Sequence, residues 1–193
     1  IIFNETREAK QNAFPIKKNL SSNKILYITK DQSEKWKFLK EKIKNVLAKN
    51  EQTLLLIPEI DPVPAWLEEL KKIGNAEVFH GKYTEKKRAE IWKKIAENEI
   101  KIVVASRLGP FTPVRNIGLI IVTNEHDETY LEDNRPYGNT RDIALKIAEE
   151  AGVEIIVESP FPGLETEEKS RKEEWEKIEK FRKIETRIID MRE

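Results

Sequence analysis

The chain has 193 residues, 38% hydrophobic and 36% charged, which suffices for one domain with a core and a short appendage. Lys plus Arg and Asp plus Glu both number 35, so the net charge of zero gives no global argument for nucleic-acid or membrane binding. The absence of cysteine excludes disulfides, cysteine-ligated zinc and thiol catalysis. No apolar run of about 18 residues is present, so we expect no membrane span and a cytoplasmic location.

Short apolar runs alternate with helical patterns from residue 24 to residue 157. The runs lack polar–apolar alternation, which is typical of parallel strands covered on both faces. The helical segments carry apolar stripes, and one of them begins at a predicted N-cap, Thr84. Strands are predicted at Lys24–Thr29, Thr53–Ile57, Ala76–Phe79, Ile100–Ala105, Leu119–Val122 and Val153–Val157, and helices at Ser33–Lys49, Ala65–Ile73, Glu85–Glu97 and Thr140–Ala151.

This alternation predicts an α/β fold with an open, doubly wound parallel sheet, in which ligands bind at the carboxyl ends of the strands. The tail differs from this pattern. Glu165–Lys183 is charged and helix-prone, with Trp175, Ile178 and Phe181 as its apolar positions. Thr186–Met191 is a candidate for one last strand. Abundant Lys, Glu and Ile with little Gln favour a thermophilic source.

Eight short segments of the chain follow one another in the order and spacing of a known family's motifs. They are Pro58-Glu59-Ile60; Phe79-His80-Gly81 with Arg88 and Trp92; Ala105-Ser106-Arg107 with Pro110 and Phe111; Asn116–Val122; Glu125-His126-Asp127 with Tyr130; Arg141-Asp142 with Ala144; Ser159-Pro160 with Leu164; and Ile188–Glu193. Together they resemble the first motor domain of the PriA-type replication-restart helicases, also called primosomal protein N′. The resemblance covers roughly residues 53–193.

The resemblance implies a RecA-like, P-loop NTPase-like sheet of about six to seven strands with helices on both faces. It places this helicase domain at residues 1–166 and a charged helical extension at 167–193, which in the family leads to a second motor domain. Because the chain begins with Ile, we expect a segment of a longer protein. By position in the motifs, the resemblance implies DNA contacts at six residues: Pro58, Glu59, Ser106, Arg107, Phe111 and Ser159.

The expected phosphate-binding turn departs from the family pattern. A P-loop needs glycines whose N–H groups surround phosphates, a Lys for the β and γ oxygens, and a Ser or Thr for Mg²⁺. Residues 29–36 read TKDQSEKW and contain no glycine. A favourable alignment leaves Lys35 as the nucleotide-binding lysine, but Trp36 then replaces the hydroxyl. Asp31 and Glu34 would repel a triphosphate.

The second nucleotide motif departs as well. The resemblance implies an Mg²⁺ carboxylate at Thr123 and a water-polarising carboxylate at Asn124, yet both side chains are neutral. Glu125 and His126 remain from the motif. The third motif has changed too, since residues 158–162 read ESPFP. We therefore expect an inactive ATPase with no metal site and no cofactor; ATP and Mg²⁺ would bind only if the degenerate sites retain affinity.

Simpler structural roles compete with the functional ones. Glu125 and Asp127 are expected to be solvated loop acids, and His126 lacks the second histidine that a metal site would need. Arg107 either contacts a nucleic acid or pairs with a neighbouring acid. The lysine-rich helix at 85–97 is expected to be a solvated face, and four aromatic residues are assigned to packing rather than base stacking: Trp66, Trp92, Trp175 and Phe181.

The sequence thus predicts an ATPase-inactive helicase-like domain of a primosomal protein that binds forked or single-stranded DNA or acts as a scaffold. Its expected partners are DNA, other domains of a longer protein and replication-restart proteins, with no membrane. One alternative is a structural protein–protein interaction domain that does not bind DNA. Another is a working ATP-dependent DNA helicase domain with unusual nucleotide ligands.

Overall fold

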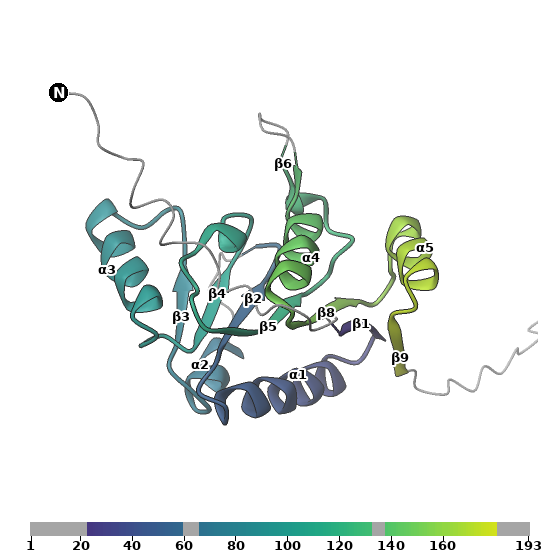
Figure 1. The fold of residues 1–193 in the computed structure, drawn as a ribbon, viewed down its shortest axis with the longest axis horizontal. Coiled ribbons are helices and arrows are strands. Elements are labelled where there is room, and N and C mark those ends of the chain that lie inside the picture. The colour runs from purple at the N-terminus through teal and green to yellow at the C-terminus, as the bar shows by residue number, and fades with distance from the viewer. Residues whose placement is uncertain (1–22, 60–65, 133–137, 181–193) are drawn as a thin grey trace, which may run out of the picture.

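A seven-stranded, all-parallel sheet forms the centre of the protein (Figure 1). The computed structural model describes residues 23–59, 66–132 and 138–180. The strand order is β3-β4-β2-β5-β8-β1-β9. Their bounds are β1 (Lys24–Thr29), β2 (Gln52–Leu56), β3 (Ala76–Phe79), β4 (Ile102–Ala105), β5 (Ile117–Val122), β8 (Glu154–Ser159) and β9 (Glu176–Lys180).

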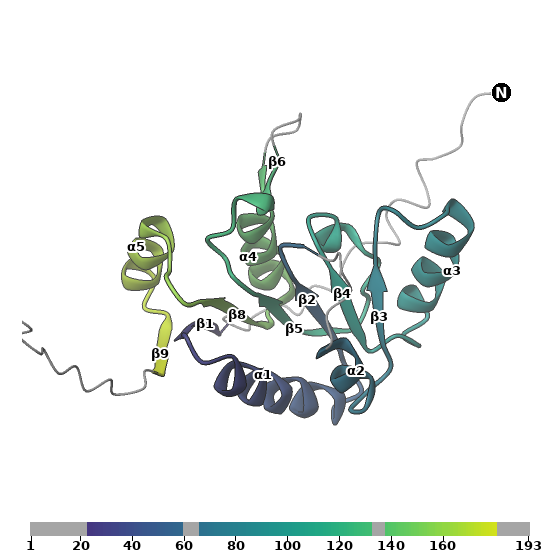
Figure 2. The same ribbon diagram turned by 180° about the vertical axis from the view of Figure 1, so that it is seen from behind.

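Helices cover both faces of this sheet, as the uniformly apolar strands predict (Figures 1 and 2). On one face lie α1 (Gln32–Leu47) and α2 (Trp66–Lys71); on the other lie α3 (Glu85–Ala96) and α4 (Thr140–Ala151). Successive residues of each strand point to opposite faces, so Leu26 joins the core under α4 while Ile25 and Tyr27 join the core under α1. The predicted open, doubly wound α/β sheet is confirmed.

Two small elements after β5 were not predicted. Glu128–Tyr130 forms a 3₁₀ turn, η3, and Leu131–Glu132 pairs as β6 with β7 (Gly138–Asn139) in a two-stranded antiparallel sheet beyond the N-terminal end of α4 (Figure 1). Another 3₁₀ turn, η2 (Gly109–Phe111), follows β4. None of the helices in the described ranges is long and apolar enough to cross a membrane.

The segment Glu165–Lys183, predicted to be helix-prone, is helical only in part over its described residues. Helix α5 (Leu164–Lys172) ends early, Glu174 takes a left-handed backbone with φ 53°, and β9 then pairs in parallel with β1. The reason is tertiary. Trp175 is buried in the core on the α4 face, so the chain must turn back toward the sheet, where β1 would otherwise be an edge strand. The predicted packing role of Trp175 is confirmed, although not within a helix.

The other aromatic predictions have different outcomes. Trp92 is 44% exposed, and its ring makes a tilted contact with that of Phe79, with ring centroids 5.8 Å apart. Its assignment to the core is therefore wrong. The side chain of Trp66, all of Phe181 and the candidate strand Thr186–Met191 lie outside the described residues. The domain boundary predicted between residues 166 and 167 falls inside α5.

Candidate functional site

Three neighbouring strands, β5, β8 and β1, bring the segments predicted as nucleotide motifs together at one edge of the sheet. Because the strands are parallel, their carboxyl ends share this edge, where α/β sheets bind ligands. The turn before α1 follows β1, residues 123–127 follow β5, and residues 160–163 follow β8.

The N-terminus of α1 is capped by the side chain of the residue that precedes it, Asp31. Asp31 is the N-cap residue, and its Oδ1 accepts hydrogen bonds from the N–H groups of Ser33 at 2.9 Å and Glu34 at 3.3 Å. The Asp31 N–H in turn donates to Thr29 Oγ1 at 3.1 Å. Free N–H groups at a helix N-terminus are what a phosphate needs, and here a carboxylate already occupies two of them.

The residue predicted to bind nucleotide, Lys35, lies in an internal ion pair with Glu158 of β8. Lys35 is 4% exposed and Glu158 is 1% exposed, and Lys35 Nζ lies 3.5 Å from Glu158 Oε2. The Asn124 N–H donates to the same oxygen at 3.1 Å. Within the part of the chain that the structure describes, Glu158 Oε1 is buried without a hydrogen-bond partner. Burial raises the pKa of Glu158, and the nearby Lys35 charge and Asn124 N–H only partly offset this.

Thr123 and Asn124 have structural roles in the turn that follows β5. The Thr123 hydroxyl donates to the Leu56 carbonyl at 3.2 Å, and the buried Tyr130 hydroxyl donates to the Thr123 carbonyl at 2.8 Å. Asn124 has φ 48°, in the left-handed region that asparagine tolerates better than most residues. Both side chains therefore fit the turn sterically and bring no charge to it.

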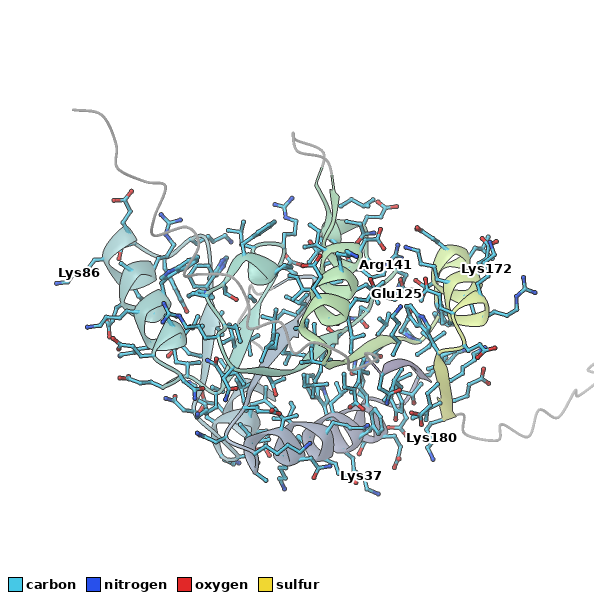
Figure 3. All side chains as sticks on the ribbon, in the orientation of Figure 1. Lys37, Lys86, Glu125, Arg141, Lys172 and Lys180 are labelled. Atoms are coloured by element: carbon cyan, nitrogen blue, oxygen red, sulfur yellow. The ribbon has the colours of Figure 1, made fainter. Side chains whose placement is uncertain are left out.

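Glu125 is a fully buried partner of Arg141, so the prediction of a solvated loop acid is wrong for this residue. Its Oε2 accepts from Arg141 Nη1 at 2.9 Å and from the Thr166 hydroxyl at 2.7 Å, and its Oε1 accepts from the Gly163 N–H at 2.7 Å. Figure 3 shows Glu125 and Arg141 together beside α4, on the side of α5. The turn after β5 folds inward because these donors replace water around the carboxylate.

Arg141 extends this network to the surface. It also donates to Asp142 and, at 2.8 Å, to Glu165, and Lys169 donates to Asp142 at 2.9 Å. Burial alone would lower the pKa of Arg141, but hydrogen bonds to the surrounding carboxylates raise it above its usual value, so the guanidinium stays charged. The network joins the end of β5 to α4 and α5.

His126 and Asp127 remain near the surface. His126 is exposed and its Nδ1 lies 2.7 Å from the hydroxyl oxygen of the buried Ser159. Asp127 is half-buried and caps η3 by accepting from the Thr129 N–H at 2.9 Å, so it too is not a freely solvated acid. Over the described ranges, no group of three or more His, Asp or Glu side chains could hold a metal ion.

Five of the six predicted DNA contacts lie at the ends of two adjacent strands. Pro58 and Glu59 follow β2, Ser106 and Arg107 follow β4, and Phe111 ends η2 with 61% of its surface exposed. Ser159 is apart from them, since β5 separates β8 from β2 and its side chain is fully buried. The β3–α3 loop adjoins this surface, because a side chain at Gly81 would touch exposed Leu108.

The lysine-rich helix α3 is largely a solvated face with internal pairs. Lys94 lies 2.6 Å from Glu90 and Lys93 lies 3.7 Å from Glu97, each one helical turn away. Lys87 lies 3.9 Å from the centre of the Tyr83 ring. These contacts are those of an exposed helix and do not by themselves mark a binding site.

Comparison of the sequence with curated proteins gives one consistent result. The chain is 29% identical over 161 residues to the replication restart protein PriA of Bacillus subtilis (strain 168), an alignment covering 79% of the chain and 20% of that relative. It is 34% identical over 124 residues to PriA of Helicobacter pylori (strain J99), covering 63% of the chain and 20% of the relative. The chain is PriA-like. It spans about a fifth of the length of these relatives, and no protein-family model matches it.

Solved structures independently show the same fold. The C-terminal domain of S. cerevisiae Dbp5 superposes with a TM-score of 0.60 at 10% identity, covering 82% of this chain and 89% of that one. The DUF1998 helicase MrfA superposes with a TM-score of 0.57 at 16% identity, covering 81% of this chain and 27% of that one. The RecA-like helicase fold implied by the resemblance to PriA is therefore confirmed.

Proposed function

We propose that this PriA-like chain is a nucleotide-independent module of a replication-restart protein, which binds forked or single-stranded DNA without hydrolysing ATP. One observation carries the proposal. The charged groups left at the nucleotide motifs are held by other protein groups: Lys35 by Glu158, and Glu125 by Arg141. A motor must keep such groups available for the phosphates and Mg²⁺ of the nucleotide.

The loss of charge after β5 supports the same conclusion. Mg²⁺ is held in such sites by carboxylates, and Thr123 and Asn124 offer none. The nearest carboxylate along the chain, Glu125, has both oxygens occupied by Arg141, Thr166 and Gly163. Freeing Glu125 for a metal would leave Arg141 buried without its main partner, which is strongly unfavourable.

The DNA part of the proposal is supported by the surface at the ends of β2 and β4. Exposed Phe111 and Leu108 lie there beside Arg107, which combines an aromatic platform with a basic side chain. Single strands are bound by such combinations, because bases stack on aromatic rings while cations attract the backbone. PriA relatives are replication restart proteins by name, and MrfA is described in a DNA-bound structure with a TM-score of 0.51 to this chain.

A fluorescence-anisotropy titration of a forked oligonucleotide at low salt tests DNA binding. We expect micromolar affinity for the wild-type chain and about tenfold weaker binding by Phe111→Ala, since one stacked base is worth about 1–3 kcal/mol. Phe161→Ala is the matched control, because Phe161 is equally exposed, at 61%, but follows β8. Absence of binding by the wild type at micromolar concentration, in the chain and in its full-length protein, would overturn the DNA part.

Calorimetric titration with ATP, with and without Mg²⁺, tests nucleotide independence. We expect no magnesium-dependent binding, because Lys35 and Glu125 are held by Glu158 and Arg141. Tight binding that requires Mg²⁺ would instead favour a working helicase domain with unusual ligands.

A purely structural role is the second candidate. Its support is the exposed apolar pair that follows β8, in which Leu164 is 91% exposed and Phe161 is 61% exposed, as expected of a protein contact surface. A domain that binds no DNA but loses a partner upon Leu164→Ser would have this role.

A further inference from the structure

Internal carboxylates stand at both positions where a phosphate-binding turn would present its donors. Asp31 accepts from two N–H groups at the start of α1, and Glu158 accepts from the Asn124 N–H and faces the Lys35 ammonium. Each donor set is of the kind that binds oxyanions: a helix N-terminus in one case, and a lysine with a backbone N–H in the other.

The Lys35–Glu158 pair is not arranged as a structural ion pair usually is. Both side chains are at least 95% buried, so both ions have lost their hydration, which only a close and fully hydrogen-bonded geometry compensates. Yet the closest contact between the two charges is 3.5 Å, and Glu158 Oε1 has no partner in the described structure. A buried unsatisfied carboxylate oxygen requires an explanation other than stability.

We propose that the Glu158 carboxylate is a built-in anion that closes a latent oxyanion site formed by Lys35 and the Asn124 N–H. The ligand class of the opened site is a single inorganic phosphate group. A triphosphate is excluded, because Asp31 still occupies the N–H groups of Ser33 and Glu34. This inference rests on the proposed nucleotide independence and gives its mechanism: the domain carries its own anion and therefore does not require one from solution.

Removing the carboxylate is expected to open the site. In Glu158→Ala the Lys35 ammonium and the Asn124 N–H lose their common acceptor, and the removed carboxylate leaves space for another oxyanion. Since the variant leaves a buried cation unpaired, it should be less stable than the wild type in chloride and should regain stability in phosphate. The wild type should show no such rescue.

The experiment is thermal unfolding of the purified chain at pH 7 in phosphate and in chloride at equal ionic strength. We expect phosphate well above its Kd to raise the Tm of Glu158→Ala by about 3 °C more than that of the wild type. Glu154→Ala is the matched control on the same strand. It removes a carboxylate that pairs with the partly exposed Lys42 at 2.9 Å, and it should show the wild-type response.

The double variant Lys35→Met with Glu158→Ala identifies the binding group. It should lose the phosphate-specific rise, because the latent site has lost its cation. An equal rise in the double variant and in Glu158→Ala, or an equal rise in the wild type, would overturn the proposal. If Glu158→Ala does not fold in either salt, Glu158→Ser also shortens the side chain and keeps a hydroxyl beside Lys35. The Asn124 amide resonance of that variant should shift with phosphate, and an unchanged resonance would also overturn the proposal.

Failure of this inference can be distinguished from failure of the proposed function. A chain that shows the phosphate rescue but binds no DNA retains the latent site and loses the proposed DNA role. A chain that binds DNA without ATP but shows no rescue retains the function and loses the latent site.

Discussion

Two buried acid–base pairs lie at the same edge of the sheet, and they are built differently. Arg141 makes five hydrogen bonds, to Glu125, Thr166, Asp142 and Glu165, and both oxygens of Glu125 have partners. Lys35 meets Glu158 only at 3.5 Å, and one oxygen of Glu158 has no partner among the described residues. The hydrogen-bonding groups of the first pair are therefore satisfied, whereas those of the second pair are not.

The difference separates a structural network from the proposed latent oxyanion site. A planar guanidinium can satisfy several carboxylates at fixed angles, so the Arg141 network rigidly joins β5, α4 and α5. A lysine ammonium is a compact charge on a flexible stem, which suits the reversible binding of a ligand. A position that departs from local rules of satisfaction is where function, present or past, is expected.

Removing Glu125 should produce the largest effect on stability. Glu125→Ala leaves a buried guanidinium without its central partner, which should lower the free energy of unfolding by about 3–5 kcal/mol. Urea denaturation measures the change. Glu165→Ala removes an outer partner of the same arginine, whose side chain is 60% exposed, and should cost at most about 1 kcal/mol. Similar losses for the two variants would contradict the view that the inner pair holds the network.

Replacing each pair by apolar residues should separate the two sites next. Lys35→Met with Glu158→Leu removes two incompletely satisfied charges and should be neutral or stabilising by about 1 kcal/mol. Arg141→Met with Glu125→Leu should be destabilising, because Thr166 and the Gly163 N–H lose their buried acceptor. Urea denaturation of the two double variants measures both changes in the free energy of unfolding. Destabilisation of the Lys35 double variant as large as that of the Arg141 one would mean that the two pairs are equally structural.

The sheet could be predicted from the sequence because its strands are buried on both faces. Runs such as Leu54–Ile57 and Leu119–Val122 are apolar throughout, which is typical of strands in a parallel sheet covered on both faces. Strand β9 could not be predicted, because its sequence EKIEK has no such signal. Its conformation depends on pairing with β1 and on the burial of Trp175, which are tertiary effects that override local helix propensity.

At the site, the sequence identified the neutral residues but not the partners of the charged ones. Thr123 and Asn124 could be read directly against the motif. The Arg141 and Thr166 partners of Glu125 lie 16 and 41 residues away along the chain, so only the folded structure brings them together. Two local signals were available and missed: Asp31 directly before a helix, which is typical of an N-cap, and Glu158 directly after the apolar run Ile155–Val157.

Acid titration should give the smallest but most specific contrast, because the two sites have pKa shifts of opposite sign. Burial raises the pKa of Glu158 above its ordinary value of 4.5, more than Lys35 and the Asn124 N–H lower it. Burial would also raise the pKa of Asp142, but the Lys169 hydrogen bond and the Arg141 charge outweigh it and lower the pKa below its ordinary value of 3.8.

These shifts predict opposite pH dependences. A carboxyl whose pKa is higher in the folded protein than in the unfolded chain stabilises the fold at pH values below the unfolded-state pKa. This contribution is lost as the pH rises through the folded-state pKa. The wild type should therefore lose stability relative to Glu158→Gln from about pH 4.5 toward neutrality. A lowered pKa acts the other way. The advantage of the wild type over Asp142→Asn should be full near neutral pH and decrease as pH falls through 3.8 and below. Urea titrations at several pH values measure both differences, and slopes of the same sign would mean that Glu158 is held as a satisfied carboxylate like those around Arg141.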